Sequence, residues 1–146
     1  MMKKLVIFIL IVLGIFPVSL FAASQEEIVI IVSSNHQVSR VTDVDLKLFY
    51  LGEKKEWEDG KPVTPVDLDE TDPLREKFDN SFLKKTLSSL KHYWIQQVFT
   101  GRGVPPLEFK TEQLAKEYIA AHPGSIGYIH SKNLDSSVKK IQITGD

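Results

Sequence analysis

The sequence predicts an α/β fold, a three-layer sandwich in which helices cover a partly parallel, mixed sheet. Short apolar runs of strand length alternate with helical segments of ten to fifteen residues, and Gly, Pro and Asp residues separate them. One of these runs, IVIIV, is apolar on both sides of the pleat, as in a strand that is covered on both faces. Because the 146-residue chain has no cysteine, the fold must depend on packing without disulfides.

The first 23 residues are predicted to be a secretory signal peptide. They start with basic residues, continue with an apolar stretch from Leu5 to about Phe16, and end in small residues after Pro17. The alternative is an uncleaved membrane anchor, which needs about 20 apolar residues without a break. The break at Pro17 favours cleavage, so residues 24–146 are expected to form one periplasmic or secreted domain without a stable membrane anchor.

The charge balance argues against a nucleic-acid partner. Removal of the leader, with Lys3 and Lys4, leaves 16 of the 18 basic residues against 19 acidic residues, a net charge of about −3. Proteins that bind nucleic acids usually carry a basic surplus. The absence of cysteine also removes thiolate metal sites from consideration.

The first half of the domain is predicted to contain two strands and two helices. A strand over 27–33 is followed by a helix that Thr42 caps and Gly52 ends. A second, short strand over 62–68 contains two prolines, which predicts an edge position or pairing confined to its middle. Asp72-Pro73 then starts the second helix. The residues expected to face inward from these two helices are Val44, Leu48, Leu51, Leu74, Phe78 and Phe82.

The second half is predicted to contain two helices and two strands. One helix runs from about Ser88 to Thr100, and Thr111 caps another that His122-Pro123 ends. Strands are expected over 126–129 and 138–143. The residues expected to face inward from the two helices are Leu90, Tyr93, Trp94, Val98, Leu114, Tyr118 and Ala121.

Several segments resemble the periplasmic phosphate-binding proteins of ABC transporters. TDVDLKLFYLGEKKEW at 42–57 is similar to that family's helix, Gly and Trp segment, and the similarity continues through DGKPVTPVDL and PLREKF. HPGSIGYI at 122–129 is similar to its Pro-Gly-Ala-Ile-Gly-Tyr segment, and VFTGRGVPP at 98–106 resembles a short, single-lobe branch. The resemblance implies one lobe of a type II periplasmic-binding-protein-like fold, a non-enzymatic role in transport, no cofactor, and phosphate as a ligand.

The chain departs from that family where phosphate is held. The family has a segment like Arg-x-x-Gly-Ser-Gly-Thr-Arg, whereas this chain has LDETDPLR from Leu68 to Arg75. Leu68 replaces the first Arg, Asp72-Pro73-Leu74 replaces Ser-Gly-Thr, and only Arg75 remains. A carboxylate at the start of a helix repels an anion, and proline removes one N–H donor. A chain of this length also supplies only one lobe, so we expect recognition at an open face or with a second protein.

Three segments are candidate ligand-binding residues. Ser33, Ser34 and Asn35 follow the first strand, where open α/β sheets bind ligands, although these residue types also suit an ordinary turn. Arg75 lies in the first turn of its helix, where a cation opposes the helix dipole and needs a partner: Asp72, Asp79 or a bound anion. Arg102, within Thr100–Gly103, could belong to an anion-binding nest or to a helix end with a flexible connector.

Other features favour structural roles. We expect the indole of Trp57 to pack over the loop before the second strand and to donate its N–H to a backbone carbonyl, with ligand stacking or partner docking as the alternative. The acidic residues at 67–72 lack the glycine and glutamate spacing of an EF-hand calcium loop. No nucleophile elbow, P-loop or dinucleotide motif supports catalysis, which makes a hydrolase the least favoured class.

The leading interpretation is therefore a non-enzymatic periplasmic protein, similar to transporter substrate-binding proteins, that binds a small oxyanion such as phosphate at an open site. The alternative is an interaction module that keeps the fold, has lost small-molecule binding, and serves an envelope transporter or sensor protein.

Overall fold

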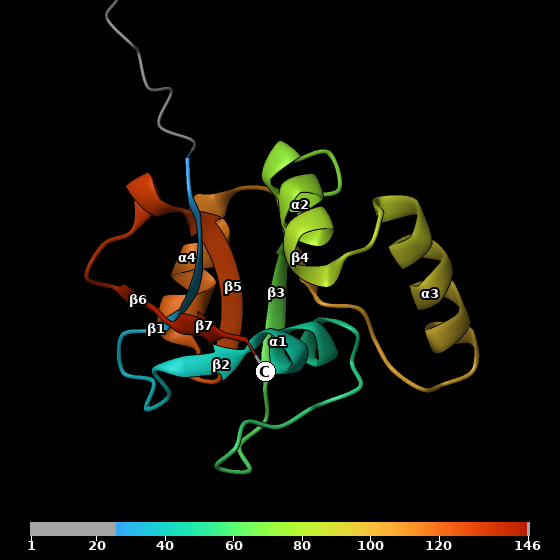
Figure 1. The fold of residues 1–146 in the computed structure, drawn as a ribbon, viewed down its shortest axis with the longest axis horizontal. Coiled ribbons are helices and arrows are strands. Elements are labelled where there is room, and N and C mark those ends of the chain that lie inside the picture. Colours follow the sequence, from blue (N-terminus) through green and yellow to red (C-terminus); the bar gives the residue numbers. More distant parts are fainter. Residues whose placement is uncertain (1–25, 146) are drawn as a thin grey trace, which may run out of the picture.

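The protein is described from residue 26 to residue 145 by a computed structural model. The predicted signal peptide, residues 1–23, lies outside the described residues. A mixed five-stranded sheet forms the middle of the molecule, with helices on both of its faces (Figure 1). This arrangement confirms the predicted α/β class with three layers.

The main sheet has the strand order β4-β3-β5-β1-β6. β3 is parallel to both β4 and β5, whereas β1 is antiparallel to both β5 and β6. The strands of this sheet are β1 (Ile28–Ser33), β3 (Thr64–Leu68), β4 (Leu107–Phe109), β5 (Ser125–His130) and β6 (Val138–Lys140).

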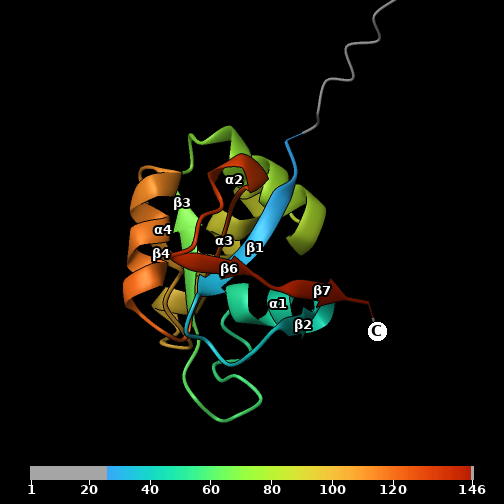
Figure 2. The same ribbon diagram turned by 90° about the vertical axis from the view of Figure 1, so that its left-hand side faces the viewer.

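A second, two-stranded parallel sheet joins β2 (Arg40–Thr42) to β7 (Gln142–Thr144), beside helix α1 (Figure 2). The strand predicted over 138–143 is therefore divided into β6 and β7. The division occurs at Ile141, which is buried and donates its N–H to the carbonyl of Ile30, before the chain turns to pair with β2.

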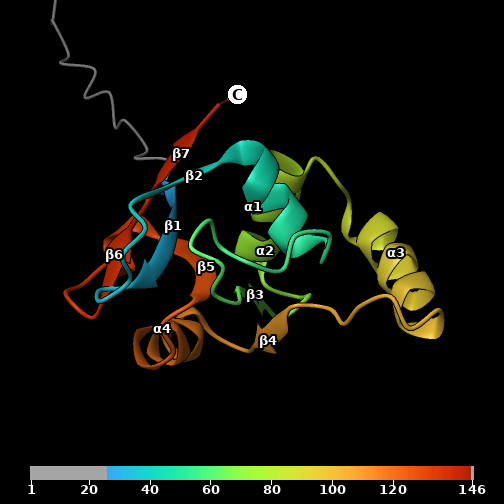
Figure 3. The same cartoon turned by 90° about the horizontal axis from the view of Figure 1, so that it is seen from below.

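The helices lie in two layers and one projecting arm. α4 (Glu112–Ala121) covers one face of the sheet, and α1 (Asp43–Tyr50) and α2 (Pro73–Phe78) cover the other (Figure 3). α3 (Leu87–Phe99) stands to one side of the body (Figures 1 and 3). Two short helices complete the fold, a π-helix η1 (Asp79–Leu83) and a 3-10 helix η2 (Ser131–Asn133).

The predicted caps are confirmed. The side chains of Thr42 and Thr111 accept hydrogen bonds from backbone N–H groups in the first turns of α1 and α4. The side chain of Asp72 does the same for α2, which starts with Pro73. Local capping chemistry thus fixes where these helices begin.

The predicted edge position of the second strand is wrong. β3 lies inside the sheet, between β4 and β5. Its ladder with β5 is short and involves Thr64 and Pro65, while β4 pairs with β3 from Val66 onward. Of the two prolines, Pro62 lies before the strand and Pro65 is its second residue. The missing N–H of Pro65 is therefore close to the start of the strand, where it costs little.

The inward faces of α1 and α4 are also partly mispredicted. Val44 and Leu114 are 45% and 47% exposed. The residues that α1 buries are Leu46, Phe49 and Tyr50. Both helices carry apolar residues on more than one side, so the sheet and not the sequence periodicity selects the buried side.

An aromatic cluster in the core joins the sheet to α1 and α2. The ring of Phe78 stacks on Tyr128 with a centroid distance of 3.9 Å, and Tyr50 lies 4.8 Å from Phe78. The hydroxyl of Tyr50 donates to the carbonyl of Val66 at 2.7 Å. Because the π-helix shifts the register after Phe78, Phe82 is only half-buried and stacks on Phe78 at 5.2 Å.

Candidate functional site

The residues predicted after β1 lie at the wrong end of the sheet for a shared site with Arg75. β1 runs antiparallel to β5, so its carboxyl end lies at the amino ends of β3 and β5. Arg75 instead contacts the carboxyl end of β3, where its Nη1 donates to the carbonyl of Leu68 at 2.8 Å. The topology therefore separates Ser33, Ser34 and Asn35 from Arg75.

Ser33 itself has a structural role. Its side chain is fully buried, and its hydroxyl donates to the carbonyl of Ala120 at 3.3 Å. This bond ties β1 to α4. Ser34 and Asn35 are exposed in the turn after the strand, and the N–H of Ser34 donates to the carbonyl of Ser137. Ordinary turn chemistry accounts for the segment.

Arg75 is buried among three carboxylates. Its guanidinium nitrogens lie 2.7 Å from Glu108, 3.3 Å from Asp67 and 3.8 Å from Asp79. Its side chain is only 9% exposed. The pairing with Asp79, one turn along the helix, confirms one of the predicted alternatives, whereas Asp72 caps the helix instead. Asp67 on β3 and Glu108 on β4 were not predicted as partners.

The surroundings of Arg75 carry more acid than base. Burial raises the pKa of Asp67, although Arg75 and the hydroxyl of Tyr128, which donates to its carboxylate, act in the opposite direction. Burial and the charge of Asp67 raise the pKa of Asp79 to about 7. Both carboxylate oxygens of Asp79 are buried without a hydrogen-bond partner in the described part of the chain. One guanidinium thus serves as the counter-ion of several carboxylates.

The segment around Arg102 forms the end of α3. The backbone N–H groups of Thr100, Gly101 and Arg102 donate to the carbonyls of Gln96, Val98 and Gln97. Gly101 adopts a φ of 67°, as expected for a residue that ends a helix. These N–H groups are occupied, so the structure favours the helix end over the anion-binding nest, and only the exposed side chain of Arg102 remains available.

α3 is anchored to the body by one side. Leu90 is buried, the hydroxyl of Tyr93 donates to the carbonyl of Leu51 at 2.6 Å, and the ring of Trp94 packs closely against Gly52. The prediction that Val98 is buried is wrong, because 54% of its surface is exposed. The anchored side ends before the last turn of the helix.

A second side of α3 leaves large apolar side chains uncovered. Ile95 is 67% exposed and Phe99 is 90% exposed, and Val104 in the following loop is 80% exposed. We call Ile95, Val98 and Phe99 the α3 apolar face. Single exposed apolar residues are common, but a cluster on one helix is typical of an interaction site.

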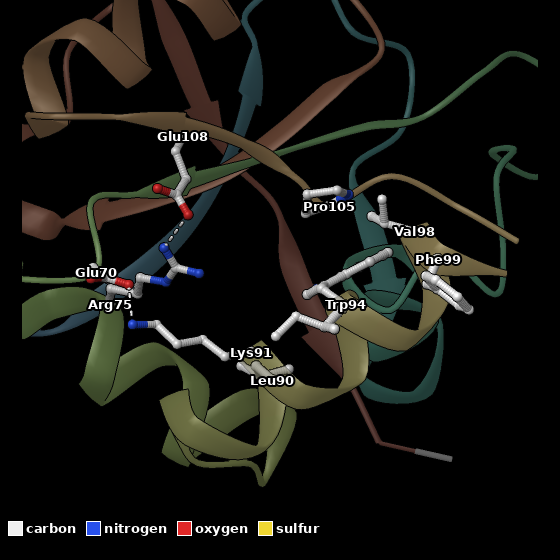
Figure 4. A pocket seen from close by; sticks show the side chains of 10 residues that line it. Glu70, Arg75, Leu90, Lys91, Trp94, Val98, Phe99, Pro105 and Glu108 are labelled. Atoms are coloured by element: carbon white, nitrogen blue, oxygen red, sulfur yellow. Dashed lines mark hydrogen bonds and ion pairs between the residues drawn. The ribbon is translucent and has the colours of Figure 1, made fainter. Parts of the chain in front are cut away.

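The α3 apolar face forms one wall of a groove of about 560 Å³ (Figure 4). Leu90 and Trp94 continue the apolar wall, and Pro105 lies opposite them. At one end the groove is polar: Lys91 pairs with Glu70 at 2.5 Å, and Arg75 pairs with Glu108. A second groove, of about 700 Å³, shares Trp94, Val98 and Pro105 with the first and includes Arg102.

Trp57 has the structural role that the sequence predicts. Its indole N–H donates to the carbonyl of Gly124 at 3.0 Å, and its side chain is buried. The ring contacts His36 and Phe49, with centroid distances of 4.5 and 5.0 Å. Trp57 thereby joins the loop before β3 to the turn before β5.

The described residues contain neither a metal-binding cluster nor a membrane-spanning helix. Between residues 26 and 145, no three His, Asp or Glu side chains are grouped so that they could hold a metal ion. Over the same residues, no helix combines the length and the apolar character needed to cross a membrane.

No family model and no curated protein matches the sequence. Among solved structures, a phosphate ABC transporter substrate-binding protein from Clostridium perfringens, with bound phosphate, is similar with a TM-score of 0.65 and 20% identity. An ABC-type phosphate transport receptor from Vibrio cholerae has a TM-score of 0.63 and 18% identity, and PstS from Borrelia burgdorferi has 0.60 and 14%.

These similarities cover 80% of this chain but only 44%, 45% and 47% of the respective structures. The chain thus spans less than half the length of the proteins that it resembles. At such low identity, the similarity concerns the fold. Residues 26–145 have the α/β fold found in part of these phosphate transport proteins.

Proposed function

We propose that this chain is a non-enzymatic recognition module of the cell envelope, which keeps the fold of one part of a phosphate transport protein and binds another envelope protein through its surface. The observation that carries this proposal is the α3 apolar face, which is uncovered beside a groove. A transporter is the class of partner that the fold similarity favours, and a sensor protein is the alternative that the sequence analysis leaves open. The envelope location rests on the predicted signal peptide.

The charge balance around Arg75 supports this choice over small-anion binding. An oxyanion site needs N–H donors or cations that other acceptors do not occupy. Arg75 already faces Glu108, Asp67 and Asp79, and Lys91 is paired with Glu70. The Nε atom of Arg75 has no hydrogen-bond partner in the described part of the chain, but it is buried and lies 3.8 Å from the carboxylate of Asp79. A phosphate entering the groove would have to displace Glu108 and would still meet buried carboxylates.

Phosphate binding at an open site is the second candidate function. It is favoured by the phosphate bound to the similar Clostridium perfringens protein and by the position of Arg75 at the wall of the groove. This candidate requires Glu108, whose side chain is 51% exposed, to swing away from Arg75 when the anion binds. Binding of phosphate would then raise the melting temperature in a saturable manner.

A photo-cross-linking amino acid placed at position 99 tests the interaction module in cells that export the protein. We expect a discrete cross-linked species containing one envelope protein, because Phe99 is the most exposed residue of the α3 apolar face. The matched control is position 114, since Leu114 is also exposed but lies on α4. Cross-links that are equal at both positions, or absent from both, would contradict the proposal.

A further inference from the structure

We propose that the groove beside α3 binds an amphipathic helix of the partner protein, and that the polar positions of this helix are acidic. The inference rests on the proposed function, and it specifies the chemistry of the partner. It follows from the apolar residues that α3 leaves uncovered, from the shape of the groove, and from the charge of the surrounding segment.

α3 carries apolar residues on two adjoining sides. The helix presents Leu90, Tyr93 and Trp94 to the body, and it presents Ile95, Val98 and Phe99 on the adjoining side. Apolar residues therefore occupy far more of its circumference than a surface helix needs to contact its own domain. In isolation this chain covers only the first of these two sides. The second side is available to another molecule.

The surface beside α3 is concave and has two walls. The α3 apolar face is not a flat patch, because it forms a wall of the groove whose other wall includes Pro105 and Glu108 (Figure 4). Concave apolar grooves with two walls bind rod-shaped amphipathic helices, which insert side chains spaced three and four residues apart. α3 lines the groove from Leu90 to Phe99, a length of about 15 Å, which corresponds to nearly three turns of a bound helix.

The segment that contains α3 carries a positive net charge. From Asn80 to Leu107 the sequence contains no Asp or Glu and four basic residues, Lys84, Lys85, Lys91 and Arg102. The rest of the chain after residue 23 has 12 basic and 19 acidic residues. Within the groove the charges are paired, Glu70 with Lys91 and Glu108 with Arg75. Lys84 and Lys85 precede α3 and Arg102 follows it, so basic residues flank both ends of the helix beside the groove and attract an acidic segment. Such charges chiefly accelerate association and select the partner.

The same observations disfavour two other occupants. In a symmetric dimer, antiparallel α3 helices would place Lys84 and Lys85 of one copy near Arg102 of the other, and like charges would repel. A lipid bilayer is planar and would leave the groove unfilled.

A display library of 16-residue helical peptides, selected on the purified protein, tests the proposal. We expect the enriched peptides to share an apolar stripe and a net negative charge. Their affinity should fall at least tenfold for the Ile95→Ser/Phe99→Ser variant and remain unchanged for the control Leu114→Ser. The charge contribution is tested with Lys84→Gln/Lys85→Gln/Arg102→Gln, which should weaken binding several-fold at low salt and much less at high salt. The matched control replaces Lys61, Lys77 and Lys132, which lie outside this segment.

The inference would be overturned by enriched peptides that are neutral or basic, by no enrichment at all, by binding that the Ile95→Ser/Phe99→Ser variant retains, or by a dimer that this variant abolishes. Binding of the protein to vesicles of phosphatidylglycerol, lost in the same variant, would assign the face to a membrane and would equally overturn it. If position 99 still cross-links to an envelope protein in any of these cases, the proposed function stands and only the partner's chemistry is wrong.

Discussion

The Nη1 atom of Arg75 lies 2.7 Å from Oε2 of Glu108, so an arginine that α2 holds in the core is tied to a half-exposed carboxylate on the edge strand β4. Asp67 and Asp79 approach the same guanidinium from β3 and from the start of η1. Residues 68–75 correspond to the segment that holds phosphate in the similar family, and Arg75 is the one basic residue of that segment that this chain retains. In this structure it stabilises the protein's own carboxylates.

The first prediction concerns the pH dependence of stability. The pKa of Asp79 is raised from 3.8 to about 7 by burial and by the charge of Asp67, against the attraction of Arg75. The folded state therefore holds a proton that the unfolded state releases near pH 4. The stability contributed by this proton is complete below about pH 4 and is lost as the pH rises to about 7.

Replacing Asp79 by Asn removes this titration. The difference in unfolding free energy between Asp79→Asn and the unmodified protein should shift in favour of the variant between pH 4 and 7, by up to about 1.4 kcal/mol per pH unit. Urea denaturation at several pH values measures the difference. A constant difference over this range would show that Asp79 is ionised in the folded protein.

The second prediction concerns Trp57. The variant Trp57→Phe loses the hydrogen bond to the carbonyl of Gly124 and part of a buried ring, so it should lose about 1–3 kcal/mol of stability. Trp94→Phe is the matched control, because Trp94 is only partly buried and should lose less than about 1 kcal/mol. Equal losses, measured by urea denaturation, would be inconsistent with a structural role for Trp57.

The third prediction concerns the turn before β5. Gly124 has a φ of 100°, and a Cβ atom added there would lie 2.9 Å from the carbonyl oxygen of Pro62. Gly124→Ala should therefore cost about 2 kcal/mol or more, from backbone strain and this collision. Gly60 has a φ of 79° and no atom within 4 Å of the added Cβ, so Gly60→Ala should cost only about 1 kcal/mol. Thermal denaturation measures both losses, and an equal loss for the two variants would contradict a role for the close approach at Gly124.

The fourth prediction separates the two sides of α3. Leu90→Ala should lose about 2–4 kcal/mol, because the side chain is buried against the body. Phe99→Ser should change the stability by no more than about 0.5 kcal/mol, because 90% of the side chain is already exposed. Urea denaturation of the two variants measures both effects. A large loss for Phe99→Ser would mean that α3 packs differently and that its apolar face is not free.

Much of the fold was predictable because local signals determine it. Thr42, Asp72 and Thr111 specify the starts of three helices, and the apolar run in β1 specifies a strand covered on both faces. The direction of β1 was not predictable in this way, since an apolar strand has the same composition in either direction. Its antiparallel pairing with β5 places Ser33 at the opposite end of the sheet from Arg75.

Only one of the three carboxylate partners of Arg75 was predictable from the sequence. Asp79 was predictable because helical residues four apart are neighbours. Asp67 and Glu108 approach from two strands that lie 41 positions apart in the sequence, and only the parallel pairing of β3 with β4 brings them together. The one sequence signal for Asp67 was an acidic residue inside an otherwise apolar strand. The exposure of Val98 was not predictable from the sequence either. α3 is apolar on two sides, and the sequence does not show which of them contacts the domain.

A phosphate titration tests most directly whether this fold works through its surface or through an oxyanion site. The melting temperature of the purified protein should be measured up to 10 mM phosphate, with sulfate at the same ionic strength as the control. If Arg75 is committed to Glu108, Asp67 and Asp79, phosphate and sulfate should produce the same small, non-saturating change. A saturable rise that only phosphate produces would contradict this account.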